Sequence, residues 1–159
     1  MMKTRYSQPA FTLIECLIAI TILAGSIMAM TVAVTSAQSQ MQQLRHAQQA
    51  MMLAEELMER VNAEPYDDPN GITTTGPDGG VINNMDDYDG FTEAAGQLKN
   101  PSGTLYPSEF QTFSRTVAAK YGTITLPGFG ASNCLNVTVT VTDAHSAQWK
   151  LTACFPEPP

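Results

Sequence analysis

Three aspartates between positions 86 and 90 form the densest group of metal-ligand side chains in the chain. The stretch Asp86-Asp87-Tyr88-Asp89-Gly90, here called the acidic turn, combines three carboxylates with a glycine that favours a tight turn. A hard cation such as calcium prefers oxygen ligands of this kind. The spacing differs from an EF-hand loop, and many acidic turns are plain solvated surface. Two interpretations therefore stay open: a calcium site at Asp86, Asp87 and Asp89, or a polar turn.

The three cysteines divide into one near the N-terminus and two near the C-terminus. Cys134 and Cys154 fit one disulfide, which would form in an oxidising compartment, and the alternative is two free buried thiols. Cys16 lies inside an apolar run and is interpreted as a small apolar residue there. The sequence thus predicts a Cys134–Cys154 bridge in a domain that folds outside the cytoplasm.

Other chemistry-bearing patterns are lacking in the sequence. It contains no nucleophile motif, phosphate-binding loop or paired-cysteine zinc signature. The two histidines, His46 and His145, are far apart in the sequence, and each is interpreted as a solvated polar residue. A net charge of −7 with only eight Lys and Arg leaves no basic face for phosphates. We therefore expect neither an enzyme nor a nucleic-acid-binding protein.

The N-terminal segment has the pattern of a membrane anchor. Lys3 and Arg5 precede an apolar run from Phe11 to Val34 whose one charged member is Glu15. At about 1.5 Å per helical residue, this run spans the roughly 30 Å hydrocarbon core of a bilayer. Because basic residues precede the run, the positive-inside rule predicts a cytoplasmic N-terminus and an exported C-terminal part.

Glu15 needs a partner if the run lies in a membrane, because a carboxylate there costs on the order of a few kcal/mol. Cleavage between Ala10 and Phe11 would create an α-amino group four residues before Glu15, on the same helix face. That positive charge could lie in the same subunit or in a neighbour. The alternative is a Glu15 side chain that reaches the lipid headgroups.

The residues Ala10-Phe11-Thr12-Leu13-Ile14-Glu15, followed by the apolar run, resemble the class III signal of type IV pilins and pseudopilins. In that family a prepilin peptidase cuts before the Phe and methylates the new N-terminus, and the Glu guides docking into the growing fibre. The resemblance implies processing at Ala10 and Phe11 and a role for Glu15 in assembly. Ala10 is a departure, since the family usually has Gly before the cut.

Two other kinds of processing are conceivable for an N-terminal segment of this composition. A conventional signal peptide would be cut after Thr35-Ser36-Ala37, at the far end of the apolar run. Lipoprotein processing at Cys16 would need a small residue before the cysteine, and Glu15 is not small. The first alternative stays open and the second is disfavoured.

The chain beyond the anchor predicts a continuation of the same helix. Residues 36–63 are rich in Gln, Ala, Met and Glu without Pro or Gly, and Pro65 marks the stop. Apolar residues recur there at spacings of three and four, which predicts one packed face. This predicted methionine stripe consists of Met41, Leu44, Ala47, Met51, Ala54, Met58 and Val61.

Residues 64–108 are rich in Gly, Pro, Asp and Asn and lack a clear period, so they predict a long loop region. Tyr66, Ile82, Tyr88 and Phe91 are the expected apolar anchors of this region. Tyr66-Asp67-Asp68-Pro69 and the acidic turn resemble MSHA-type minor pilins and PilV-like subunits. The apolar run also lacks the kinking proline common in major pilins, which favours a minor pilin or pseudopilin.

Strict alternation near the C-terminus predicts a β-hairpin. Apolar residues alternate with polar ones over residues 135–142 and 149–155, with residues 143–147 as the turn. We expect Val137 opposite Leu151, Val139 opposite Trp149, and Cys134 directly opposite Cys154. One or two further strands are expected within residues 110–126. The predicted fold is α+β, with the long helix packed on a small antiparallel sheet over residues 109–159, as the resemblance to pilins implies.

The predicted function is that of a minor pilin subunit that enters or initiates a type IV, MSHA-like fibre. The resemblance implies a prepilin peptidase, other pilin or pseudopilin subunits, an inner-membrane assembly platform and membrane lipid as partners. It also implies a single pass through the inner membrane with a periplasmic or extracellular C-terminal domain. The alternatives are a pseudopilin of a type II secretion system and a secreted or anchored binding domain.

Overall fold

The computed structural model describes residues 12–68, 76–77, 81–126 and 130–158. The chain folds into one long helix followed by a four-stranded antiparallel sheet, which confirms the predicted α+β fold. The elements are α1 (Leu13–Asn62), the short 3-10 helix η1 (Asp86–Tyr88), β1 (Thr92–Glu93), β2 (Ser114–Leu126), β3 (Gly130–Thr142) and β4 (Gln148–Pro156). The predicted cleavage position, Ala10 and Phe11, lies outside the described residues.

The chain divides into two compact units, residues 1–44 and residues 45–159. In the described part of the first unit, α1 is helical from Leu13 onward, and its side chains are exposed. The hydroxyls of Thr21, Ser26 and Thr31 donate to carbonyl oxygens one turn earlier in the helix. These polar groups are therefore satisfied within the helix, as an apolar environment requires.

The first unit contains a candidate membrane span. Among the described residues, α1 is the one helix long and apolar enough to cross a bilayer, with a mean hydropathy of 2.4 in its most apolar window. That window has no buried residues. A length of 50 residues is more than a bilayer needs, so only part of α1 would lie in it.

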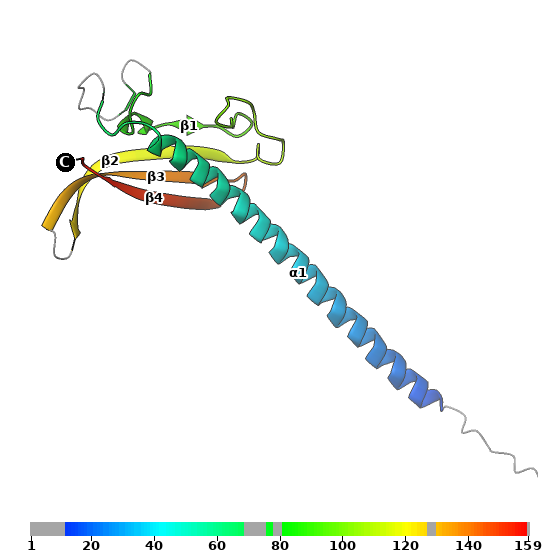
Figure 1. The fold of residues 1–159 in the computed structure, drawn as a ribbon. Coiled ribbons are helices and arrows are strands. Elements are labelled where there is room, and N and C mark those ends of the chain that lie inside the picture. The colour runs from blue at the N-terminus through cyan, green and yellow to red at the C-terminus, as the bar shows by residue number, and fades with distance from the viewer. Residues whose placement is uncertain (1–11, 69–75, 78–80, 127–129, 159) are drawn as a thin grey trace, which may run out of the picture. The chain divides into compact units, whose positions relative to one another are not determined.

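The second unit contains the hydrophobic core. Its strands follow the order β1-β2-β3-β4, and each neighbouring pair is antiparallel (Figure 1). The part of α1 after Arg45 buries one face against the sheet through Ala50, Leu53, Ala54, Leu57, Met58 and Val61. The opposing side chains include Val117, Val137, Val139 and Val141.

The methionine stripe was only partly correct as a prediction. Ala54, Met58 and Val61 are buried, but Met41 and Leu44 are 58% and 64% exposed. The buried positions of α1 begin only at Ala50 and include leucines that the stripe omitted. Met41 and Leu44 belong to the first compact unit, whereas the buried positions of the stripe belong to the second.

The loop region contains more structure than expected. Strand β1 lies within it and pairs Thr92 with Thr116 on β2. Its predicted anchors all join the core, since Tyr88 is buried and Tyr66, Ile82 and Phe91 pack against it. The further strands expected within residues 110–126 form one strand, β2, which pairs with β3 along its whole length.

The predicted register of the C-terminal hairpin was wrong by two residues. Val139 lies opposite Leu151 and Val141 opposite Trp149, while Val137 lies opposite Ala153. The turn occupies residues 143–147, as predicted, and the strands close between Thr142 and Gln148, which the predicted pairs did not match. A shift of two residues keeps every side chain on its predicted face, so the apolar face of the hairpin was predicted correctly.

Candidate functional site

Glu15 lies in the first turn of α1 and caps the helix. Its Oε2 accepts hydrogen bonds from the backbone N–H and the hydroxyl of Thr12, at 2.9 and 2.8 Å. The Thr12 hydroxyl in turn lies 3.4 Å from the backbone nitrogen of Glu15 and accepts from it. This reciprocal pattern is a capping box, which the spacing Thr12-Leu13-Ile14-Glu15 encodes and the sequence analysis missed. Thr12 thus supplies a partner for Glu15 within the chain.

The helix that follows this cap presents apolar side chains without a protein partner in its own unit. Leu13, Ile22, Met28 and Val34 are all more than half exposed, as are seven other large apolar residues up to Val34. Burying one Val, Leu or Ile side chain is worth about 1.5–3 kcal/mol. A long apolar helix of this kind is compatible with a membrane anchor.

Cys134 and Cys154 are neighbours on adjacent strands but are not directly opposed. Cys134 lies opposite Pro156, and Cys154 lies opposite Asn136, so the two cysteines are diagonal neighbours on one face of the sheet. Both are free thiols in this structure, with Cys134 buried and Cys154 exposed. A hydrogen bond between the thiols raises the pKa of Cys154. The predicted direct opposition was wrong, and the disulfide itself stays a prediction that this proximity favours.

Two aspartates of the acidic turn are buried rather than solvated. Asp86 and Asp87 are each 1% exposed and lie in η1. Asp86 accepts a hydrogen bond from the Tyr121 hydroxyl at 2.8 Å, and Asp87 accepts one from the backbone N–H of Asn83 at 2.8 Å. The second oxygen of each carboxylate is buried without a hydrogen bond to the described residues. A plain solvated turn is therefore the wrong interpretation for these two residues.

Asp89, the third aspartate, binds to strand β2. Its Oδ1 accepts a hydrogen bond from the Ala119 N–H at 2.9 Å, and its Oδ2 lies 3.6 Å from Nζ of Lys120. The three carboxylates thus have separate protein partners. In the part of the chain that the structure describes, no three or more His, Cys, Asp or Glu side chains are placed to hold a metal ion. The calcium prediction gains no support from this arrangement.

The two histidines approach the same carboxylate, which the sequence analysis did not foresee. Nδ1 of His46 on α1 lies 3.6 Å from Oδ2 of Asp143, and Nδ1 of His145 lies 3.9 Å from the same oxygen. Asp143 is held in place because its other oxygen accepts the N–H groups of His145 and Ala147. His46 also lies 4.6 Å from the Phe113 ring. Only His145, with a side chain 89% exposed, fits the predicted solvated residue.

Arg115, which lies within the strand region predicted at residues 110–126, is a buried cation. It is fully buried and bonds to Glu93 through Nε, at 2.7 Å, and through Nη2. Its guanidinium also donates to the carbonyl oxygens of Leu53 and Lys99, at 3.2 and 2.9 Å, and lies 3.5 Å from Glu56. Arg115 therefore joins α1, β1, β2 and the loop after β1. The sequence does contain a signal for this burial: Arg115 stands at one of the alternate strand positions that point into the core.

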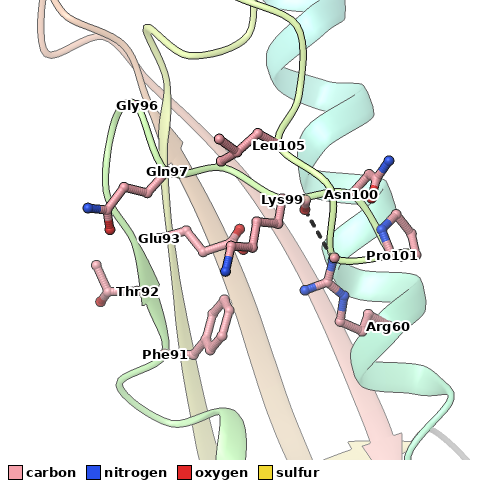
Figure 2. A pocket seen from close by; sticks show the side chains of 11 residues that line it. Arg60, Phe91, Thr92, Glu93, Gly96, Gln97, Lys99, Asn100, Pro101 and Leu105 are labelled. Carbon is pink, nitrogen blue, oxygen red and sulfur yellow. Dashed lines mark hydrogen bonds between the residues drawn. The ribbon is translucent and has the colours of Figure 1, made fainter.

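A groove of about 750 Å³ lies beside this cluster, between Arg60 on α1 and the loop that contains β1 (Figure 2). The loop contributes ten lining residues between Phe91 and Leu105. Arg60 donates to the Lys99 carbonyl at 3.3 Å, which holds this edge of the groove to the helix. The lining includes cationic, acidic, neutral polar and apolar side chains.

Comparison with known proteins identifies no relative. No family model, curated protein or solved structure matches the chain. The resemblance to type IV pilins therefore depends on the residues of the N-terminal segment and on the order of elements that follow it.

Proposed function

We propose that this protein is an assembly subunit of the minor-pilin kind, anchored in the inner membrane by the first half of α1 before it joins a fibre of like helices. The observation that carries the proposal is the signal-like segment, residues 10–15, directly followed by a helix with exposed apolar side chains. Such a helix is stable in lipid and against other apolar helices. The role is structural and requires no catalytic site.

The capping box refines the proposed role of Glu15. In the single chain, Thr12 donates two hydrogen bonds to one carboxylate oxygen of Glu15. Among the described residues, no cationic group forms an ion pair with Glu15. Two hydrogen bonds stabilise a carboxylate but do not neutralise it. The proposal is that a positive charge created at Phe11 by cleavage, in the same or a neighbouring subunit, completes this site.

N-terminal sequencing of the mature protein tests the processing step. A mature chain that begins at Phe11, with a methylated amino group, supports the proposal. A chain that begins at Gln38 instead identifies a conventionally exported domain and refutes it. The same experiment leaves a type II secretion pseudopilin as an alternative, because that family is processed at the same position.

Three variants separate the charge of Glu15 from its capping role. Glu15→Gln keeps a hydrogen-bond acceptor for Thr12 but removes the charge, Thr12→Val removes the hydroxyl and keeps the charge, and Glu15→Ala removes both functions. We expect all three to be cleaved, and only the two Glu15 variants to be depleted in sheared fibres relative to membranes. Wild-type incorporation of Glu15→Gln would show that the charge has no role in assembly.

A further inference from the structure

The groove beside Arg60 carries positive charge in a protein that is otherwise acidic. The chain has 15 acidic and eight basic residues, and two of those eight, Arg60 and Lys99, line this groove. Glu93 is the one acidic residue in the lining, and its carboxylate is held by the buried Arg115. The groove therefore presents cations whose charge the lining itself does not balance.

Both cations have hydrogen-bonding capacity to spare. The side-chain amine of Lys99 has no hydrogen bond or ion pair within the described ranges, and the residue is exposed. Arg60 makes two long contacts through Nη2, 3.3 Å to the Lys99 carbonyl and 3.6 Å to Glu56. A guanidinium has five N–H donors, so most of those of Arg60 remain free for a ligand.

The rest of the lining is neutral and varied. Gln97 provides an amide. The Thr92 hydroxyl donates to the Gly90 carbonyl at 3.3 Å and Oδ1 of Asn100 accepts from the Thr104 N–H at 2.9 Å, which leaves the hydroxyl oxygen of Thr92 and the NH2 group of Asn100 for a ligand. Phe91 and Leu105 provide apolar surface, with Leu105 56% exposed (Figure 2). Hydroxyl and amide groups bind the hydroxyls of a ligand, and an aromatic ring packs against apolar ring faces. This combination matches a compact ligand with both hydroxyls and C–H faces.

The loop that forms the groove is held in a fixed conformation. The Lys99 carbonyl accepts from Arg115 at 2.9 Å, and Leu98 beside it is fully buried. Gly96 and Gly103 adopt φ angles of 83° and 79°, which disfavour other residues, and an added Cβ at either would meet no atom within 4 Å. The two glycines thus form turns in the groove lining whose backbone conformation favours glycine.

We propose that this groove binds an acidic sugar, with the carboxylate of a uronic acid unit held by Arg60 and Lys99 and its ring lying near Phe91. We infer a carboxylate on the ligand because two cations line the groove. We infer a sugar ring because the rest of the lining is neutral polar and aromatic. The proposal concerns the second unit only and does not depend on the proposed role in a fibre.

The test uses the full-length, isotope-labelled chain in a non-ionic detergent, with D-galacturonate as the probe and nuclear magnetic resonance shifts as the readout. D-galactose, which lacks the carboxylate, and acetate, which lacks the ring, are the comparison ligands. We expect galacturonate to shift the amide signals of Gly96 and Gly103 with a dissociation constant of about 1 mM. Galactose and acetate should cause much smaller shifts at equal concentration.

Lys99→Gln is the matched variant because its amine has no internal partner to lose. We expect it to weaken galacturonate binding about threefold to fivefold, as for an exposed charge pair. Lys150→Gln, on an exposed position of β4, removes the same charge elsewhere and should bind like the wild type. The proposal is overturned if galacturonate leaves Gly96 and Gly103 unshifted, if acetate or galactose binds as well, or if the two lysine variants behave alike.

Discussion

Removing the buried Arg115 should destabilise the second unit more than any change at an exposed lysine. The guanidinium is fully buried and contacts two carboxylates and two carbonyl oxygens. Replacement by Leu would leave Glu93 partly buried without its cation and the Lys99 carbonyl without its shortest donor. The loop that contains β1 would then lose its main attachment to α1.

Breaking a buried ion pair by removing one partner costs about 3–5 kcal/mol, because the remaining charge stays desolvated. The side chains of Glu93 and Glu56 are only 11% and 19% exposed, so water would solvate their charges only weakly once the guanidinium is removed. For a domain of this size, each kcal/mol corresponds to about 2–6 °C in melting temperature, which predicts a fall of roughly 6–30 °C.

The assay is thermal unfolding of the full-length chain in detergent, followed by near-ultraviolet circular dichroism, to which Trp149 near the core contributes. Lys150→Leu is the matched control, since it deletes an exposed cation from the same sheet. Arg115→Lys should fall between the two, because an ammonium keeps the charge but cannot reproduce the planar fork. An Arg115→Leu variant that melts within about 2 °C of the Lys150→Leu control would refute the reasoning.

Three further predictions follow from the C-terminal hairpin and the acidic turn. Non-reducing mass spectrometry of the exported protein should show one peptide pair bridged by Cys134 and Cys154, and finding both cysteines alkylated would contradict the disulfide. Replacing both by Ser should then lower the free energy of unfolding by on the order of 3 kcal/mol in the chain-entropy model. Burial, and then the hydrogen bond to Asp86, raises the pKa of Tyr121, so stability should fall as the pH rises above about 10, where unfolded tyrosines ionise. Tyr121→Phe should show a shallower alkaline loss in a denaturant titration, and equal slopes would argue against this. Because the carboxylates of the acidic turn have separate partners, about 1 mM calcium should leave the melting temperature unchanged, whereas a clear rise would restore the calcium interpretation.

Much of the fold could be predicted from local patterns. The length and continuity of α1 follow from an uninterrupted run of helix-forming residues, and the faces of β3 and β4 follow from strict alternation. The capping box of Thr12 and Glu15 is equally local, and it was within reach of the sequence although it was missed. These features depend on residues within a few positions of one another, so their physics is contained in short stretches of sequence.

The tertiary structure alone decided which pairs of residues meet. The packed face of α1, for example, is limited to the residues that the sheet covers. Asp143 approaches His46 on α1, and Arg115 binds carboxylates from α1 and β1, across long separations in the chain. The groove beside Arg60 arises in the same way, from a helix and a loop that are distant in sequence. Periodicity indicates which face of an element is buried, but which distant residues meet there is settled by packing and by the need to satisfy buried charges.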